Sequence, residues 1–403
     1  MAGQPKNRKE IVFLIKCMYS GGAERVMSML ADACAARGRE TSLILTHQSL
    51  ADANLSRLSD KVRVLSLEDE LAREQTNEAG AAAEILCARA LGKLPAKLAP
   101  GAADRSSILK YRARNHASVR WLQGYFAAHP NASVVAFLYD SIFLTLLAAR
   151  KTNRVIISDR GDPQQSISSK TDMAFFRRMF PKADAMVFQS PGVRDWYMKN
   201  IGLDGEIIFN PVKDGLPQPF EGVRKKRIVN FCRLTAQKNL FLLLDSFERL
   251  SRDYPEYELH IYGDLDESER EYGERFLRAV KHSPAAEKIK VFPARADIHE
   301  AVLDSAMFVS SSDFEGMSNS MLEAMAIGLP VICTDCPAGG ARAVIRDHEN
   351  GLLVPVKDAG ALYRAMKELI EDPGLAERLS RGGREIRETQ SCDGIINQWM
   401  EII

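Results

Sequence analysis

Short apolar runs alternate along the chain with stretches of helical period. Residues 11–15 form one such run, and a stretch follows with apolar residues on one helical face, namely Val26, Met27, Leu30, Ala33 and Cys34. A continuous apolar run of this length is typical of a strand buried on both faces, and the i, i+3, i+4 spacing is typical of an amphipathic helix. Gly38 is expected to end that helix. Repeated strand–helix units predict a parallel sheet with helices on both faces.

The alternation continues through two halves of the chain. Further strands are expected in the first half at residues 41–45, 62–67, 133–138, 155–158, 185–189 and 206–209. In the second half they are expected at residues 228–232, 258–262, 288–292, 307–310, 330–333 and 351–354, with helices at 240–250 and from Glu267. Residues 211–226 hold two glycines and three prolines, which indicates a linker. The pattern therefore predicts two doubly wound, Rossmann-like α/β domains facing each other across a cleft.

The strongest motif is residues 310–330, SSSDFEGMSNSMLEAMAIGLP. A strand ends in a loop of small residues, and a helix follows whose first N–H groups favour an anion. Glu315 lies in the loop and Glu323 in the helix, where their carboxylates suit sugar and ribose hydroxyls. Gly316 allows close approach of the backbone to a ligand. Ser320 and Glu323 also fit a capping box, so a structural role for Glu323 stays open.

A second motif, residues 231–239 (FCRLTAQKN), places two cations at a strand-to-helix turn. Arg233 offers a planar fork and Lys238 a point charge, a combination that suits a diphosphate. Taken alone, the motif also fits a solvated basic turn. Its position beside the glutamate motif favours the binding role.

With these motifs the sequence resembles family 4 of the retaining glycosyltransferases, which have the GT-B fold. The resemblance spans nearly the whole chain. It rests on GGAERV at 21–26, RLTAQKN at 233–239, the E-x7-E pair Glu315 and Glu323, GLPVICTD at 328–335 and NGLLV at 350–354. It implies an acceptor-side domain at 1–210, a nucleotide-sugar donor domain at 211–389, and a last helix, about 390–403, that returns to the first domain.

The resemblance also implies roles for single residues. Arg233 and Lys238 would bind and stabilise the diphosphate leaving group, and Glu315 would hold the donor sugar with the backbone around Gly316, Met317 and Ser318. Glu323 would hold the ribose. Backbone amides of the set Ser318, Asn319 and Ser320 would contact phosphate, and the backbone at Ala294 and Arg295 would face the base. Gly21 and Gly22 would face the donor phosphates from the other domain.

Two positions depart from the family pattern. Asp264-Leu265-Asp266 replaces a Gly-x-Gly turn and resembles the metal motif of the other major glycosyltransferase fold. We interpret it as a solvated turn, because Arg233 and Lys238 already supply positive charge, and expect no metal and no cofactor. Asp140 stands near the position where many relatives have a histidine that contacts donor sugar and acceptor, which puts that role in doubt.

The first half carries further candidates for acceptor binding. Asp159 and Arg160 follow a predicted strand and are expected to face the cleft as acceptor-side residues, although an Asx-turn with a surface arginine fits equally. No Asp or Glu occurs between Arg105 and Tyr139, while this segment has five Lys or Arg and several aromatic residues. A basic amphipathic helix of this kind suits an anionic membrane surface. A helix packed on its own domain is the alternative.

Composition narrows the classes of function. The 403 residues are 46% hydrophobic and 27% charged, as in ordinary globular proteins, and the net charge of +1 divides into +8 for residues 1–210 and −7 for the remainder. A basic first half favours an anionic partner there. The longest apolar runs are too short for a signal sequence or a membrane span, and the seven scattered cysteines suit a reducing compartment. A cytoplasmic protein, peripheral on the inner face of the cell membrane, is expected.

The resulting hypothesis is a retaining, metal-independent hexosyltransferase. Its donor would be a nucleotide-diphosphate sugar, with UDP as the guess, and its acceptor a lipid-linked or nascent polysaccharide glycan, as in lipopolysaccharide or exopolysaccharide biosynthesis. No nucleic-acid partner is expected. A dehydrogenase is disfavoured because no G-x-G-x-x-G follows the first strand. A sugar-nucleotide epimerase, another GT-B enzyme and a non-catalytic membrane-associated scaffold stay open as alternatives.

Overall fold

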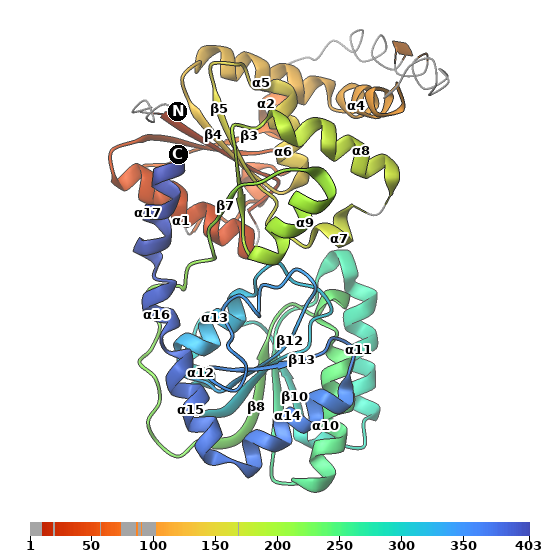
Figure 1. The fold of residues 1–403 in the computed structure, drawn as a ribbon, viewed down its shortest axis with the longest axis vertical. Helices are drawn as coiled ribbons and strands as arrows, with labels where there is room; N and C mark the ends of the chain where they lie inside the picture. The colour runs from red at the N-terminus through yellow and green to blue at the C-terminus, as the bar shows by residue number, and fades with distance from the viewer. Residues whose placement is uncertain are drawn as a thin grey trace. The chain divides into compact units, whose positions relative to one another are not determined.

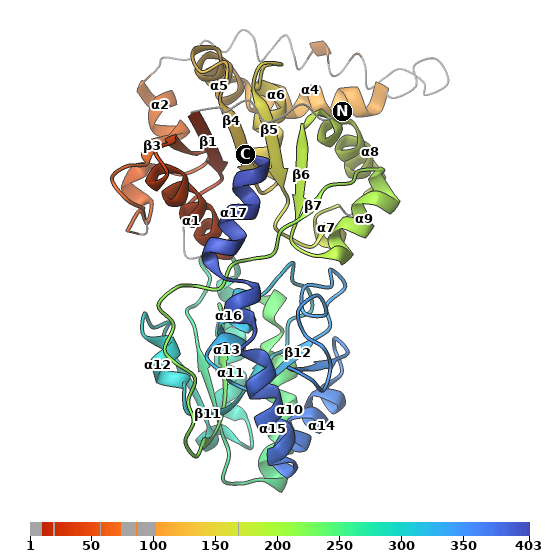
Figure 2. The same ribbon diagram turned by 60° about the vertical axis from the view of Figure 1, so that its left-hand side comes forward.

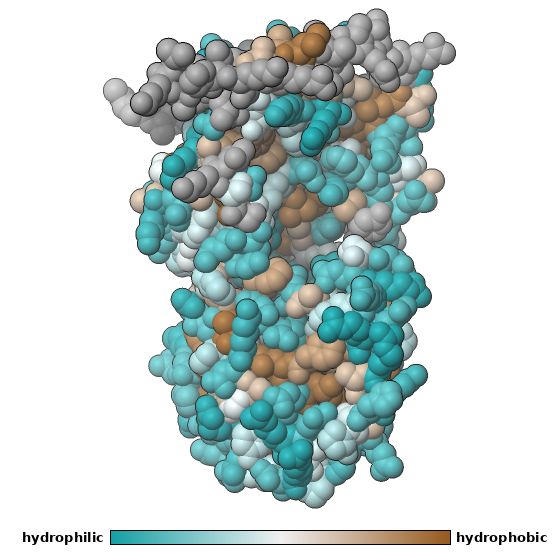
Figure 3. Space-filling model, turned by 90° about the vertical axis from the view of Figure 1, so that its right-hand side faces the viewer, coloured by the Kyte–Doolittle hydropathy of each residue, from teal (hydrophilic) through white to brown (hydrophobic). Residues whose placement is uncertain are grey.

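The computed structural model describes residues 10–18, 21–56, 58–73, 86–87, 90, 102–167 and 169–403. The chain divides into two compact units (Figure 1). The N-terminal unit comprises Met1–Gln189, Val193–Ile208 and Ile396–Ile403, and the C-terminal unit comprises Ser190–Gly192 and Phe209–Ile395. No described helix has both the length and the apolar character needed to cross a bilayer. On the face drawn in Figure 3, hydrophilic residues cover most of the C-terminal unit and hydrophobic residues form smaller groups between them.

The N-terminal unit is built on a parallel sheet with strand order β3-β2-β1-β4-β5-β6-β7. Its strands are β1 (Glu10–Ile15), β2 (Glu40–Leu45), β3 (Arg63–Ser66), β4 (Ser133–Phe137), β5 (Arg154–Ser158), β6 (Ala185–Phe188) and β7 (Glu206–Ile207). Every predicted strand of this half is confirmed to within a few residues. The order reverses between β1 and β4, so the loops after these two strands diverge and leave room for a ligand at the carboxyl edge.

The helices of this unit are α1 (Gly22–Ala36), α2 (Leu67–Arg73), α4 (Ala102–Arg114), α5 (His116–Ala128), α6 (Tyr139–Ala148), α7 (Pro163–Ser166), α8 (Lys170–Met179), α9 (Pro191–Ile201) and α17 (Cys392–Ile402). The last of these, α17, lies against β4 and α1 (Figure 2). Trp399 is fully buried with its ring 5.5 Å from that of Phe137, and the Ser133 hydroxyl donates to the Ile403 carbonyl at 2.8 Å. From Ile396 on, the C-terminal helix is therefore part of the N-terminal unit.

The C-terminal unit has a second parallel sheet, with order β10-β9-β8-β11-β12-β13. Its strands are β8 (Lys225–Phe231), β9 (Glu258–Tyr262), β10 (Ile289–Phe292), β11 (Ser305–Ser310), β12 (Val331–Thr334) and β13 (Leu352–Val354). The order reverses between β8 and β11. The two strongest sequence motifs follow these two strands, and the fold therefore brings them together at one switch point.

Helices cover both faces of this second sheet, and a separate apolar core fills each side. Figure 1 shows α12 (Ile298–Val302) and α13 (Asn319–Ala326) on one side, and α10 (Leu240–Asp253), α11 (Arg270–His282) and α14 (Ala359–Glu371) on the other. The remaining helices are α15 (Pro373–Gly383) and α16 (Ile386–Thr389). Buried aliphatic side chains such as Leu243 and Leu322 anchor these helices on the sheet. The rigid core fixes the positions of the loops at the carboxyl edge.

The basic segment after Arg105 differs from its prediction. It forms two helices, α4 and α5, with a break at Asn115, where φ is −107° and ψ is 26°. Leu122 and Phe126 are buried, and the Tyr111 ring packs 5.6 Å from Phe143 and 6.0 Å from Phe175. These three side chains pack within the unit's own core, as the alternative interpretation of this segment expects.

Candidate functional site

The candidate site is built from two loops at the switch point of the C-terminal unit. One loop follows β8 and the other follows β11, and hydrogen bonds join them. The Ser311 hydroxyl donates to the Lys238 carbonyl at 2.9 Å, Asp313 N–H donates to the Gln237 carbonyl at 2.9 Å, and the Asn239 amide donates to the Asp313 carboxylate at 2.7 Å. The two loops therefore form one preorganised layer over the carboxyl edge of the sheet.

Lys238 and Glu315 meet at the centre of this layer. The Lys238 ammonium pairs with Oε1 of Glu315, and the two side chains are 16% and 15% exposed. The Ser312 hydroxyl donates to the same oxygen at 3.2 Å. Burial disfavours the charged ammonium, but the charge and hydrogen bond of Glu315 outweigh it and raise the pKa of Lys238. Lys238 and Glu315 therefore form an ion pair in a site that is largely shielded from water.

Arg233 lies on the same turn in a more open position. Its side chain is 55% exposed and pairs with Asp266 at 2.6 Å. Asp264, the other acid of the metal-like triplet, accepts a hydrogen bond from the Ala294 N–H at 3.0 Å. Each of the two acids thus has a protein partner in the free chain. Among the described residues, no cluster of three or more His, Cys, Asp or Glu could hold a metal ion.

Glycines allow the backbone to pack closely around these loops. A Cβ on Gly263 would lie 1.8 Å from the Cys232 carbonyl oxygen, and one on Gly340 would lie 1.9 Å from the Gly316 carbonyl oxygen. Both distances are far below a van der Waals contact. The turn after β9 therefore supports the Arg233 turn from beneath, and the segment around Gly340 supports the Glu315 loop.

The residues that the sequence predicts to contact phosphate lie at the start of α13. Ser318 is the N-cap residue, and its hydroxyl accepts from Met321 N–H at 3.3 Å. The capping-box alternative with Ser320 is wrong, because Ser320 lies within the first turn of the helix and donates to or accepts from Ser318 at 3.1 Å. Asn210 fixes this end of the helix by donating to the Asn319 side chain at 2.8 Å and to the Met317 carbonyl at 3.3 Å.

Glu323 lies further along α13, where its residue is 6% exposed. Nε2 of His299, on α12, is 2.9 Å from Oε2 of Glu323. Sequence reasoning missed His299, because nothing in the local sequence distinguishes this histidine from a surface residue of a short helix. Arg295 precedes α12 and is exposed, and its guanidinium forms two hydrogen bonds with the Asp297 carboxylate at 2.9 and 2.7 Å.

The switch point of the N-terminal unit carries a second charged pair. The Lys16 ammonium, directly after β1, is 3.2 Å from Asp140 in the first turn of α6, and both side chains are about half exposed, at 49% and 43%. Sequence reasoning missed Lys16, although its position just after the first strand was a usable signal. Gly21 is the N-cap residue of α1 and Gly22 its first residue. A Cβ on Gly21 would lie 2.0 Å from the Glu24 carboxylate, so a phosphate at this helix end requires Glu24 to move.

Asp159 and Arg160 lie deeper than the sequence suggested. Asp159 is 2% exposed, and its Oδ2 accepts hydrogen bonds from Tyr139 at 2.6 Å and Tyr197 at 2.9 Å. Burial raises the pKa of Asp159 to about 6, although both tyrosine hydroxyls oppose the shift. Arg160 is 9% exposed, has a φ of 63°, and stacks 4.8 Å over the Phe137 ring. The alternative of a surface arginine is therefore wrong.

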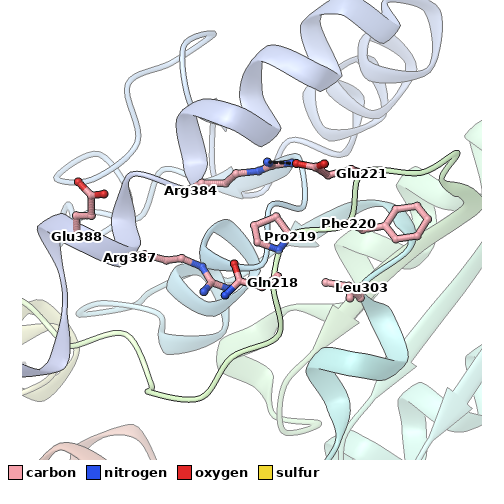
Figure 4. A pocket seen from close by; sticks show the side chains of 8 residues that line it. All are labelled: Gln218, Pro219, Phe220, Glu221, Leu303, Arg384, Arg387 and Glu388. Carbon is pink, nitrogen blue, oxygen red and sulfur yellow. Dashed lines mark ion pairs between the residues drawn. The ribbon is translucent and has the colours of Figure 1, made fainter.

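A separate hollow of about 670 Å³ lies at the opposite, amino edge of the second sheet (Figure 4). It is lined by Gln218, Pro219, Phe220, Glu221, Leu303, Arg384, Arg387 and Glu388. Figure 4 shows the Arg384 side chain directed toward Glu221, and the two groups are 3.5 Å apart. Leu303 precedes β11, whereas Glu315 follows it, so this hollow is not part of the candidate site.

Comparisons with known proteins agree with this geometry. Residues 217–386 match the family model for glycosyl transferases group 1. An N-acetylgalactosaminyltransferase of Campylobacter jejuni that acts on a diphospho-undecaprenol-linked sugar is 26% identical over 253 residues, which cover 59% of this chain and 67% of that enzyme. The putative glycosyltransferase EpsD of Bacillus subtilis is 28% identical over 231 residues, which cover 53% of this chain and 57% of that protein. For other curated relatives the alignment covers as little as 23% of their length.

Solved structures match over nearly the whole chain. TarM gives a TM-score of 0.76 at 12% identity, with 99% of each chain covered. HepE of Anabaena, in complex with UDP, gives a TM-score of 0.73 at 17% identity, with 97% of this chain and 98% of that chain covered. The fold is therefore GT-B, and together the comparisons support a glycosyltransferase.

Proposed function

We propose that this chain is a retaining glycosyltransferase that moves a sugar from a nucleoside-diphosphate donor to a glycan acceptor. The observation that carries the proposal is the layer of two joined loops that holds the Lys238–Glu315 pair at the switch point, with Arg233 beside it. Fixed charges in a partly dry site suit a reaction in which negative charge develops on a leaving group. The family match to residues 217–386 supports the same reading.

In the proposed reaction the bond from the donor's anomeric carbon to the β-phosphate oxygen breaks. The bond from the acceptor oxygen to the same carbon forms on the same face, and the acceptor proton passes to the departing phosphate oxygen. Arg233 and Lys238 stabilise the charge on that diphosphate, while Glu315 accepts hydrogen bonds from the sugar. The backbone from Gly316 to Ser320 and the base-facing loop at Arg295 complete the donor site.

Metal independence is a further part of the proposal. Arg233, Lys238 and the amino end of α13 supply the positive charge that a divalent ion supplies elsewhere. Turnover should survive EDTA. Loss of turnover on chelation, restored by Mg²⁺ or Mn²⁺, would reassign Asp264 and Asp266 as metal ligands.

UDP is the favoured nucleotide and a hexose or N-acetylhexosamine the favoured sugar. HepE has been crystallised with UDP and with UDP-glucose, and TarM of S. aureus with UDP. These ligands belong to those proteins, and for this chain they define the first compounds to test. The matched C. jejuni enzyme, whose name includes a diphospho-undecaprenol-linked sugar, favours a lipid-linked acceptor, and a nascent polysaccharide is the second acceptor proposed.

The acceptor is proposed to bind at the N-terminal unit, where Asp140, Asp159 and Arg160 lie at the carboxyl edge of β4 and β5. We place the enzyme in the cytoplasm, peripheral on the inner membrane face. Support comes from a group of cations that we call the α4–α8 cluster: Arg112, Arg178 and Lys182. Helix α4 packs against α8, and burial, Arg178 and Arg112 lower the pKa of Lys182.

Two rival functions make different predictions. A sugar-nucleotide epimerase would turn over its donor without any acceptor. A non-catalytic scaffold would have no use for Lys238, Glu315 and Arg233 at one switch point.

A thermal-shift panel of UDP-, GDP- and ADP-sugars tests the central proposal. A donor at 100 times its Kd adds about 2.7 kcal/mol of stability, which produces a clear rise in melting temperature. We expect one nucleotide series to stabilise the wild type and to lose this effect in Lys238→Ala. A panel in which no nucleotide sugar stabilises the protein would contradict the donor site.

A further inference from the structure

The buried pair between His299 and Glu323 is not explained by leaving-group chemistry. His299 is 5% exposed and Glu323 is 6% exposed, and 2.9 Å separates Nε2 from Oε2. A hydrogen bond therefore joins the His299 imidazole to the Glu323 carboxyl group. The two residues stand 24 positions apart in the sequence and belong to different helices, α12 and α13.

Stability alone is a weak reason for such a pair. Burying two polar groups has a desolvation cost that their attraction roughly offsets, and apolar residues of similar volume often serve as well. What a buried hydrogen bond supplies reliably is a fixed orientation. Here it fixes the carboxylate that the proposed function assigns to the ribose.

The location of the pair supports a role in ligand binding. The His299 ring lies edge-on to Phe231, with centroids 6.0 Å apart, and Phe231 is the last residue of β8, two positions before Arg233. The pair thus lies beside the turn that carries the diphosphate cations. On the loop before α12, the charges of Arg295 and Asp297 satisfy each other, and neither is bonded to His299 among the hydrogen bonds of the described chain.

We infer that His299 is a positioning residue that orients the Glu323 carboxylate toward the two hydroxyls of a ribose, and so sets a preference for ribonucleotides. The inference rests on the proposed function, which makes Glu323 the ribose ligand. The contact with a buried ring restricts the orientation of the Glu323 carboxylate. The two hydroxyls of a ribose would then donate to a carboxylate whose orientation is already restricted before the ligand binds.

Dissociation constants for matched ligands test this role. UDP, GDP and ADP, each with its 2′,3′-dideoxy counterpart, would be titrated calorimetrically into the wild type, His299→Leu, His299→Gln and Glu323→Gln. For the base that binds best, we expect the wild type to prefer the ribose form. His299→Leu should weaken that form roughly tenfold or more, since a hydrogen bond to a charged group is lost, and leave the dideoxy form unchanged. His299→Gln keeps an N–H donor at similar reach and should retain most of the preference.

The outcomes separate the inference from the function on which it rests. An unchanged ribose preference in His299→Leu would overturn the inference, whether both ligand forms bind as in the wild type or both are weakened equally. If Glu323→Gln kept the wild-type preference, the assignment of the ribose to Glu323 would fail instead. Should His299→Leu not fold, His299→Asn, whose amide is too short to reach Glu323, replaces it against His299→Gln.

Discussion

Lys238 and Glu315 show how the donor site combines charge with burial. Both side chains are mostly shielded from water, and each is neutralised by the other in the free chain. The charge and hydrogen bond of Glu315 raise the pKa of Lys238, which keeps the ammonium protonated throughout the physiological range. When a donor binds, its phosphates would contact Lys238 and its sugar hydroxyls would contact Glu315. These contacts would replace the one between the two side chains.

Glu315→Gln and Lys238→Ala should each reduce transfer by roughly 10²–10³ in kcat while the protein stays folded. The physical reason is the loss of a fixed charge that acts on the leaving group or on the sugar. Steady-state kinetics and circular dichroism on each variant measure this. Lys226→Ala and Glu256→Gln, which disrupt an exposed pair of 3.1 Å in the same unit, are matched controls and should stay near wild type. Folded Glu315 and Lys238 variants within a few-fold of wild type would refute the assignment.

Asp159 provides a prediction about pH. Its pKa is about 6 in the folded chain, against an ordinary value of 3.8, because burial disfavours the carboxylate. The folded state thus binds this proton more tightly than the unfolded state, and its stabilising effect is greatest below pH 4 and is lost as the pH rises through 6. At about 1.4 kcal/mol per unit, the loss is about 2–3 kcal/mol.

Asp159→Asn should remove this dependence, because its side-chain oxygen still accepts a hydrogen bond but carries no charge. We expect the variant to be more stable than wild type at pH 7 and the two proteins to converge near pH 4. Denaturant unfolding at several pH values measures the difference. A difference that stays constant from pH 4 to pH 7 would show that Asp159 does not titrate in this window.

At the scale of elements, the two loops at the second switch point act as one layer because backbone and side-chain bonds join them. Thr334 extends the layer to β12 by donating to the Ser312 carbonyl at 2.6 Å. Gly340 closes it from the other side, since any side chain there would press on the Gly316 carbonyl.

Gly340→Ala should therefore displace the Glu315 loop. We expect a loss of about 1–3 kcal/mol in the free energy of unfolding, as for other overpacked sites, and a weakened binding of nucleotide. Gly124→Ala is the control, because a Cβ there meets nothing within 4 Å and the residue lies inside helix α5. That change should stabilise the protein slightly. If Gly340→Ala bound nucleotide as wild type does, the loop would be more tolerant than its packing indicates.

For the whole molecule, the uneven charge distribution leads to a prediction about membranes. The α4–α8 cluster of Arg112, Arg178 and Lys182 belongs to the basic half of the chain. Each cation near an anionic surface contributes about 1 kcal/mol, screened within about 8 Å at physiological salt. Since Leu122 and Phe126 of α5 are buried in the unit's own core, attraction of charge is the proposed source of binding.

Arg178→Glu/Lys182→Glu should bind anionic liposomes more weakly by roughly 2–4 kcal/mol, and salt should release the wild type. Co-sedimentation across a salt series measures both effects. Arg150→Glu/Lys151→Glu makes the same change of charge at an exposed turn of the same unit and should bind nearly as the wild type does. Equal weakening by both double variants would show an effect of net charge alone, and no binding by the wild type at low salt would make a soluble acceptor the better hypothesis.

Local pattern alone was enough to predict most elements of this chain. Strands and helices follow from runs of apolar residues and their periods, which are local properties, and all the predicted strands appear near their expected bounds. Lys238 and Glu315 were also identifiable, because each lies in the segment that follows a strand and the carboxyl ends of parallel strands share one edge. The order of strands and loops along the chain therefore predicts that both residues lie at the carboxyl edge of the sheet.

Other features depend on contacts between distant segments. His299 meets Glu323 only because α12 and α13 pack on the same face of the sheet, and Lys16 meets Asp140 only because β4 pairs with β1. The burial of Asp159 depends on Tyr139 and Tyr197, which come from two helices that no local pattern links. The sequence by itself determined the elements and the edge at which the charged motifs lie. The tertiary structure decided which charges meet and how deeply they are buried, because strand order and helix packing result from non-local contacts.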